Sequence, residues 1–288
     1  MTRHKLCTHL LVISFCLLAF AANATTFTFT AIPDEDESRL VARFGAVADY
    51  LSEELGVEVN YIPVKSYAAA VTAFRNGQVQ LAWFGGLSGV QARLQVPGSV
   101  ALAQGYEDQF FKTYLIANTR TGLTRSKKFP AAIKGKTFTF GSKGSTSGRL
   151  MPEYYIREFF EQPPQRVFSR VGFSGDHSMT IAQVQAGAFD VGAVNYLVWE
   201  SELAAGKVDL QKVRVIWETP DYPDYQWTLR GDADKQFGAG FANKVKRALV
   251  EMNDPELLAS FPRKSFVPAD NSDYTAIEET ARAIQLIR

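Results

Sequence analysis

Apolar and polar positions follow two rhythms along this chain, one typical of strands and one typical of helices. Thr26–Ile32 alternates with a period of two and predicts a strand. Ser38–Leu55 carries apolar residues three and four positions apart and predicts a helix, which Gly56 would end. The same succession then recurs, as it does in βαβ units.

Two successive sets of such units are predicted. The first continues with strands at Val57–Val64, Val79–Phe84, Ser99–Gln104 and Thr113–Asn118, and with helices after Ser66 and after Gly85-Gly86. The second has strands at Lys136–Ser142, Val167–Val171, Val191–Val194 and Val213–Trp217, a helix that ends at Phe160 and another at Ser178–Ala186. The remaining chain is predicted to be mainly helical, with helices at Phe237–Met252 and Tyr274–Ile287.

These two sets predict an α/β fold made of two doubly wound lobes. A barrel is disfavoured because it needs eight regular strand–helix pairs. We expect lobe 1 to hold residues 25–115 and 222–288, and lobe 2 to hold residues 116–221. In such sheets small ligands bind beyond the C-terminal ends of strands, near helix N-termini. A ligand cleft between the lobes is therefore expected.

The first 24 residues have the pattern of a secretory signal. Arg3 and Lys5 precede a short apolar run, and Ala22-Asn23-Ala24 supplies the small residues that signal peptidase requires. A retained anchor is disfavoured because the run is too short to span a membrane. A lipoprotein anchor at Cys16 is disfavoured because Phe15 stands where that signal needs a small residue. We expect cleavage after Ala24 and a periplasmic monomer.

Composition narrows the chemistry further. The 31 basic and 30 acidic residues nearly cancel, which argues against a nucleic-acid-binding surface. Both cysteines, Cys7 and Cys16, would leave with the signal, so no disulfide, thiol nucleophile or thiolate metal site is expected. His177 is the only histidine beyond the signal, which disfavours a multi-histidine metal site. We expect no metal and no cofactor, and no later apolar run is long enough to span a membrane.

The strongest local motif is Gly141-Ser142-Lys143-Gly144-Ser145-Thr146-Ser147-Gly148, between a predicted strand and a predicted helix. Small residues let the backbone approach a ligand, and the first N–H groups of a helix are free donors. The hydroxyl row (Ser145, Thr146 and Ser147) adds uncharged donors, so this segment is predicted to bind an oxyanion. Taken alone, the pattern also fits a capped helix behind a flexible turn. It is not a Walker loop, because no Gly-Lys-Ser/Thr follows at the required spacing.

A second strand-to-helix junction is Gly175-Asp176-His177-Ser178. His177 can donate a hydrogen bond to an anion, and its protonated form would add charge, although a single histidine in a loop is more often only solvated. A Ser/His hydrolase is the catalytic alternative. No Gly-x-Ser-x-Gly elbow occurs, and the hydroxyl row has no unique nucleophile. We therefore expect a binding protein and not an enzyme.

Six short stretches, in this order, carry a resemblance to a known family: Ala31-Ile32-Pro33-Asp34-Glu35-Asp36, Ala48-Asp49-Tyr50-Leu51, Ser66-Tyr67-Ala68-Ala69-Ala70-Val71, Leu81-Ala82-Trp83-Phe84-Gly85-Gly86-Leu87-Ser88, Gly144-Ser145-Thr146-Ser147-Gly148 and Gly175-Asp176-His177. Over nearly all of the chain after the signal, the sequence resembles the periplasmic phosphate/phosphite/phosphonate-binding proteins of ABC importers, which have the type 2 periplasmic-binding-protein fold. Two further stretches are similar to a subgroup labelled as selenate importers: Met151-Pro152-Glu153-Tyr154 and Tyr222-Pro223-Asp224-Tyr225-Gln226-Trp227.

The resemblance implies that the hydroxyl row and His177 grip the anion, together with Tyr67 of the first lobe and Asp224 late in the chain. Two departures from the aminoalkylphosphonate binders bear on the ligand. Those proteins carry a glutamate shortly after the strand equivalent to Val191–Val194, where this chain reads Asn195-Tyr196-Leu197-Val198, and one of their tyrosines falls on Phe111. Both departures favour a smaller anion that has no amine.

The resemblance also implies a role. We expect the protein to capture a small tetrahedral oxyanion such as phosphite, a phosphonate, phosphate or selenate, and to deliver it to a membrane permease and its ATPase. A sensor subunit that reports to a membrane receptor is the alternative. Arg149 follows the hydroxyl row and has the reach to enter the cleft. Asp224, if it faces the ligand, would favour an anion that still carries a proton, whereas selenate would bind well only if Asp224 pointed out of the cleft.

Overall fold

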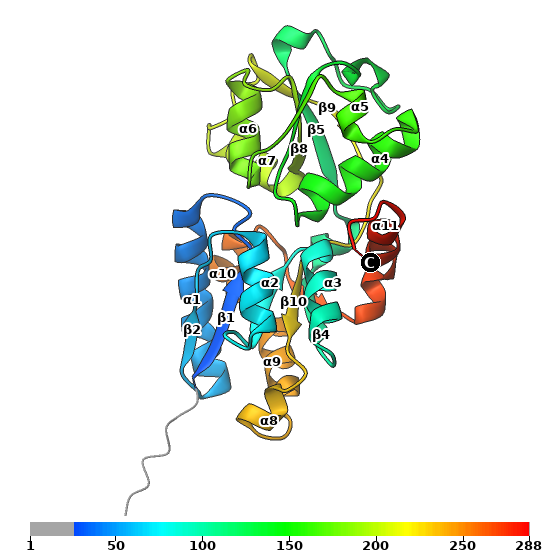
Figure 1. Ribbon diagram of the computed structural model, residues 1–288. Helices are drawn as coiled ribbons and strands as arrows, with labels where there is room; N and C mark the ends of the chain where they lie inside the picture. The colour runs from blue at the N-terminus through cyan, green and yellow to red at the C-terminus, as the bar shows by residue number, and fades with distance from the viewer. Residues whose placement is uncertain (1–25, 288) are drawn as a thin grey trace, which may run out of the picture.

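The computed structural model describes residues 26–287. The predicted signal, its cleavage site and both cysteines lie outside the described residues. The described chain folds around two β-sheets, each covered by helices, as Figure 1 shows. We keep the name lobe 1 for the body around the six-stranded sheet and lobe 2 for the body around the five-stranded sheet. The expected α/β class with two lobes is confirmed.

Lobe 1 has mixed strand directions. β1 pairs in parallel with β2 and β3, whereas β10 runs antiparallel between β3 and β4, and β11 pairs antiparallel with β4 at the edge. In spatial order the strands are β11 (Phe266–Pro268), β4 (Val100–Gly105), β10 (Gln226–Leu229), β3 (Leu81–Phe84), β1 (Phe27–Ala31) and β2 (Val59–Tyr61).

Lobe 2 is mixed as well. β6 pairs in parallel with β7 and β8, and β5 runs antiparallel between β8 and β9. Side chains alternate across this sheet: Leu115 and Ala117 pack into the core on one face, and Ile116 packs into the core on the other. In spatial order the strands are β7 (Arg170–Phe173), β6 (Thr137–Phe140), β8 (Val191–Asn195), β5 (Thr113–Asn118) and β9 (Val213–Glu218).

The helices begin where the sequence offers capping side chains. The side chain of Asp36 accepts from the first turn of α1, that of Ser66 from Ala69 in α2, and that of Asp176 from Met179 in α6. In lobe 1 the helices are α1 (Glu37–Leu55), α2 (Tyr67–Arg75), α3 (Gly86–Gln95), α8 (Ala233–Phe237), α9 (Phe241–Val250), α10 (Pro255–Ser260) and α11 (Thr275–Ala283). In lobe 2 they are α4 (Met151–Phe160), α5 (Pro164–Val167), α6 (His177–Gln185) and α7 (Tyr196–Ala204). Within residues 26–287, no helix is long and apolar enough to cross a membrane.

One predicted strand was wrong in its bounds and two strands were not predicted. The strand predicted at Val167–Val171 begins at Arg170, because Val167 closes the short helix α5. The part after residue 222 is mainly helical, as expected, but it also supplies β10 and β11 to the sheet of lobe 1. All four residues of β10 are buried, so its sequence lacks the alternation that marks a half-exposed strand.

The chain passes between the lobes at two adjacent segments. Phe111 and Tyr222 pair there as an isolated antiparallel bridge, each backbone N–H donating to the other residue's carbonyl at 2.9 and 3.0 Å. The Tyr222 hydroxyl also lies 2.7 Å from Thr113 Oγ1. Phe111 is fully buried against Tyr196, Tyr222 and Tyr225. The two lobes are thus connected by two paired chain segments that pack against aromatic side chains.

Candidate ligand-binding site

The hydroxyl row lies where β6 ends and the chain turns into α4. A π-helical turn, η4 (Thr146–Leu150), joins them, and Ser145 caps that turn by accepting from the Gly148 N–H at 2.9 Å. Gly148 is needed here, because a Cβ would come within 3.0 Å of both Ser145 Oγ and His177 Cε1. The three hydroxyl residues are at most 2% exposed. The row therefore faces the interior of the molecule and not solvent.

His177 is the first residue of α6 and is fully buried, not solvated in a loop. Its Nδ1 accepts the backbone N–H of Asn195 at 3.3 Å, so the ring proton resides on Nε2. Nε2 lies 3.5 Å from Ser147 Oγ. Burial lowers the pKa of His177 to about 3, an effect that the nearby charge of Glu35 only partly opposes. The ring is thus a neutral donor aimed along the hydroxyl row.

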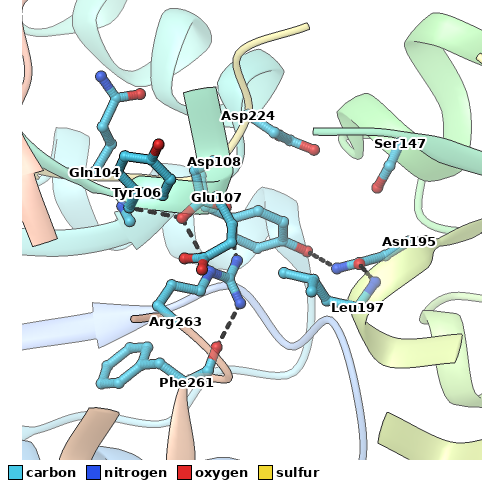
Figure 2. Close-up of polar contacts among 12 residues, drawn as sticks. Gln104, Tyr106, Glu107, Asp108, Ser147, Asn195, Leu197, Asp224, Phe261 and Arg263 are labelled. Atoms are coloured by element: carbon cyan, nitrogen blue, oxygen red, sulfur yellow. Dashed lines mark hydrogen bonds and ion pairs between the residues drawn. The ribbon is translucent and has the colours of Figure 1, made fainter. Parts of the chain in front are cut away.

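Lobe 1 meets this row with the N-terminus of α3. The backbone N–H of Gly86 donates to Asp224 Oδ1 at 2.8 Å, and that of Leu87 donates to Thr146 Oγ1 at 3.0 Å. Gly85 allows the close approach, since a Cβ there would lie 3.1 Å from Asp224 Oδ1. Figure 2 shows the Asp224 carboxyl and the Ser147 hydroxyl pointing into the same space between the lobes. The Leu87–Thr146 bond therefore joins the two lobes at this helix end, next to Asp224.

Three buried oxygen atoms at this junction have no hydrogen bond of normal length and angle within residues 26–287, although the Tyr67 hydroxyl is near enough to Ser145 to interact with it. They are Tyr67 Oη, Asp224 Oδ2 and Asp34 Oδ1. Tyr67 opens α2 and is 2% exposed, while Asp224 and Asp34 are 1% and 4% exposed. A buried polar atom without a partner costs free energy, and native proteins keep few of them. Such a cluster beside the hydroxyl row is the arrangement expected of a ligand site.

The charges in this region oppose a fully ionised ligand. Burial raises the pKa of Asp224 to about 7, against the lowering effect of its bonds to Thr146 and Gly86. Burial also raises the pKa of Asp34, which Arg43 partly offsets. Arg149 does not supply a free positive charge, because its Nε pairs with Glu153 and its guanidinium lies 4.8 Å from the ring centres of both Phe140 and Phe173.

The structure thus brings together every residue that was predicted for the site: Tyr67, Ser145, Thr146, Ser147, His177 and Asp224. Sequence reasoning missed Asp34, Tyr225 and Asn195. Tyr225 Oη donates to Asp34 Oδ2 at 2.7 Å and accepts from Asn195 Nδ2 at 3.0 Å. Asp34 follows the C-terminal end of β1, so the rule that ligands bind at strand ends offered a signal for it.

A groove of about 960 Å³ opens next to this buried cluster. Lobe 1 lines it with residues that include Asp36 and Lys65, and lobe 2 with residues that include Lys143, Asp176 and Lys207. It does not contain the hydroxyl row, His177 or Asp224. The groove is therefore the open space outside the site, while the site itself is closed over by both lobes. Within the described part of the chain, no cluster of three or more His, Cys, Asp or Glu residues could hold a metal ion.

Comparison with known proteins places this geometry in a family. Residues 29–274 match the family model of the phosphonate periplasmic substrate-binding proteins of ABC transporters. The chain is 40% identical over 274 residues to a protein of Prochlorococcus marinus named "Probable ABC transporter phosphite binding protein", covering 93% of this chain and 92% of that protein.

Solved structures agree. The structure of the Prochlorococcus marinus protein PhnD1 in complex with methylphosphonate has a TM-score of 0.86, 40% sequence identity, and coverage of 92% of this chain and 100% of that one. A binding-protein component of a phosphonate ABC transporter from Pseudomonas aeruginosa has a TM-score of 0.79 at 22% identity, covering 91% and 87% of the two chains. The second likeness bears on the fold alone. The chain belongs to the family of periplasmic substrate-binding proteins of phosphonate ABC transporters.

Proposed function

We propose that this protein captures a small phosphonate-type oxyanion, such as phosphite or methylphosphonate, and delivers it to the permease and ATPase of an ABC importer. The observation that carries the proposal is the enclosed set of uncharged donors, namely the hydroxyl row and neutral His177, opposite the unpartnered oxygen atoms of Tyr67 and Asp224. The ligands named for the Prochlorococcus marinus relative at 40% identity, phosphite and methylphosphonate, support the same class.

The proposed ligand residues are Tyr67, Ser145, Thr146, Ser147, His177 and Asp224. Asp224 is buried with its carboxyl directed between the lobes, which favours a ligand that can donate an O–H to it (Figure 2). Selenate has no proton to donate near neutral pH, so this geometry disfavours it. Leu197 and Asn195 stand near the place where amine-binding relatives carry a glutamate, and neither offers a carboxylate. We therefore expect a weaker response to 2-aminoethylphosphonate.

The geometry around His177 also argues against the hydrolase alternative. A general base must accept the serine proton, but the His177 nitrogen that faces Ser147 already carries a proton because Nδ1 accepts from Asn195. No carboxylate orients Nδ1, since a backbone N–H occupies it. We infer that binding, and not catalysis, is the work of this site.

We further propose two lobes near the expected bounds, residues 25–115 with 222–288 and residues 116–221, except that residues 113–115 belong to lobe 2 because they begin β5. The two-segment link at Phe111 and Tyr222 supports a hinge there, about which the lobes would close on the ligand. Export to the periplasm as a monomer, with cleavage after Ala24, belongs to the same proposal. An intact-mass measurement of the exported protein tests it, and a species that retains Cys16 or carries lipid would contradict it.

Isothermal calorimetry with a ligand panel tests the function. The panel comprises phosphite, methylphosphonate, phosphate, selenate, sulfate and 2-aminoethylphosphonate. We expect phosphite or methylphosphonate to bind most tightly. Aminoethylphosphonate binding more tightly than every amine-free anion would overturn the ligand class, and tightest binding of selenate would overturn the role given to Asp224.

The hydroxyl row is tested by replacing Ser145, Thr146 and Ser147 together with alanine. Each hydrogen bond to a charged ligand contributes about 1.5–3 kcal/mol, so affinity should fall by several orders of magnitude. Stability should also fall, by about 1 kcal/mol for the lost Ser145 cap and by about 1–3 kcal/mol for the buried Leu87 N–H that loses Thr146 Oγ1. The exposed pair Thr124→Ala and Ser126→Ala is the matched control. Unchanged affinity in the triple variant would rule out this site.

A further inference from the structure

We propose that Asp34 is a second acidic residue of the ligand site and that it selects a ligand which still carries a proton. The inference rests on the proposed function and deepens it. Asp34 lies in the loop between β1 and α1, and its backbone carbonyl accepts the N–H of His177 at 2.9 Å. The residue therefore sits where lobe 1 meets the helix that carries the imidazole donor.

The hydrogen bonds of Asn195 and Tyr225 identify which atom donates to Asp34. Asn195 Oδ1 accepts from the N–H groups of Leu197 and Val198 at 2.7 and 3.2 Å, which identifies the other amide atom as the nitrogen. An amide nitrogen can only donate, so Tyr225 Oη accepts from Asn195 Nδ2 and sends its own proton to Asp34 Oδ2. Asp34 is thus held as an acceptor on one oxygen.

The second oxygen, Oδ1, is buried and has no partner among residues 26–287. Burial is the main reason why the pKa values of Tyr67 and Tyr225 are raised, and the negative charge of Asp34 raises both further. Tyr67 is itself one of the proposed ligand residues, so Asp34 is close enough to the proposed site to act on it electrostatically. A ligand O–H would give this oxygen the partner that it lacks.

The nearest cations do not neutralise Asp34 by direct pairing. Arg43 donates to Glu35 at 2.5 Å, and Arg263 forms two bonds to Asp108 at 2.7 and 3.0 Å. Figure 2 shows Arg263 joined to Asp108 and to Phe261. Both guanidinium groups therefore have carboxylate partners of their own. An oxyanion without a proton would place a lone pair against Asp34 Oδ1, whereas a protonated one would donate an O–H there.

Methylphosphonate and methanesulfonate measure what a ligand O–H contributes, whichever of Asp34 and Asp224 accepts it, and the Asp34 variant below assigns that contribution. In a buffer kept below the second ionisation of methylphosphonate, the two are monoanions of nearly the same shape, and only the phosphonate carries an O–H. We expect the wild-type protein to prefer methylphosphonate by about 100-fold, the size of one good hydrogen bond to a charged group. Calorimetry of both anions measures this ratio.

The Asp34→Asn substitution replaces the unpartnered acceptor oxygen of residue 34 with an NH₂ donor. Because Tyr225 donates its proton to the side-chain oxygen, the new amide would turn its NH₂ group toward the ligand. We expect the preference for methylphosphonate to fall at least tenfold, chiefly through tighter binding of methanesulfonate. Asp36→Asn is the matched control, because Asp36 is exposed in the same loop and asparagine also caps helices. It should leave the ratio unchanged.

The outcomes separate the two proposals. A wild-type protein that binds neither phosphite nor methylphosphonate overturns the proposed function. A wild-type protein that binds methylphosphonate, with the same ratio in Asp34→Asn, overturns only the role of Asp34. Thermal melting without ligand checks the fold of the variant, and Asp34→Ser replaces it if the transition is lost. An unchanged ratio in Asp34→Ser has the same meaning.

Discussion

At the scale of single residues, the proposed site holds no free cation among its six residues, so it would recognise an anion through uncharged donors. The donors are hydroxyl groups and one imidazole whose tautomer is fixed by the Asn195 backbone N–H. The acids, Asp224 and Asp34, each keep one oxygen without a partner. A neutral donor set combined with acidic acceptors suits a ligand that both accepts and donates hydrogen bonds. Protonated phosphite and phosphonates have that character, and sulfate does not.

The protonation state of His177 gives a direct test at this scale. Its pKa is lowered to about 3 from 6.5, chiefly by burial, so the imidazole should stay neutral in the closed protein between pH 8 and pH 5. The stability that the neutral ring contributes is complete above pH 6.5 and is lost as the pH falls from there toward 3. Nitrogen NMR of the ligand-bound protein, labelled at histidine, should show one neutral tautomer with the proton on Nε2. The denatured chain serves as the control, and a folded-state midpoint near 6.5 would contradict the assignment.

At the scale of elements, a buried carboxylate ties the π-helical turn to α4. Glu153 is fully buried and pairs with Arg149 in the turn, and with Arg157 one helical turn further on at 2.6 Å. The guanidinium of Arg149 stacks on Phe140 of β6 and Phe173 of β7. The segment that holds the hydroxyl row is thereby fastened to the sheet, which keeps its donors in place.

Replacing Glu153 with alanine tests this link. Removing one partner leaves the charge of Arg149 largely buried, and such a loss typically costs about 3–5 kcal/mol of unfolding free energy. For a chain of this size we expect Tm to fall by roughly 10 °C. Differential scanning calorimetry of Glu153→Ala measures it, with the exposed Glu158→Ala on the same helix as the control. Equal Tm values for the two variants would show that the buried carboxylate does not stabilise the turn.

At the scale of the whole molecule, the lobes touch through a small number of polar bonds. Besides those at the site, Arg39 of α1 donates to Ser201 of α7 at 2.6 Å. Within residues 26–287 two chain segments connect the lobes, so these bonds and those to a bound ligand would decide how far the cleft closes. A ligand that contacts both lobes favours the closed form by the free energy of the added contacts.

Spin labels across the groove test ligand-driven closure. Lys65→Cys in lobe 1 and Lys207→Cys in lobe 2 both line the groove, and a chain begun at residue 25 carries no other cysteine. We expect methylphosphonate to shorten and narrow the distance distribution between the labels. The pair Lys65→Cys and Lys235→Cys, both within lobe 1, should not respond. If the distance distribution between the labels at residues 65 and 207 were the same with and without methylphosphonate, closure would be contradicted.

The sequence by itself determined the local elements and the identity of many site residues. The apolar periodicity of α1, its Asp36 cap and its terminal Gly56 are local features, because a helix satisfies its own hydrogen bonds. The Ser145 cap is equally local. The resemblance to the family added Tyr67 and Asp224, which no local pattern marks.

Only the tertiary structure decided the parts that depend on residues distant in sequence. β10 is buried between β3 and β4, so its assignment rests on strands more than 120 residues earlier. The tautomer of His177 depends on Asn195, and the acceptor role of Asp34 depends on Tyr225, 191 positions away. These distant partners decide which atoms donate and which accept, and they exclude water from them. Neither effect exists before the chain has folded. Sequence therefore identified which chemistry is available, and the fold decided which atoms face the proposed site.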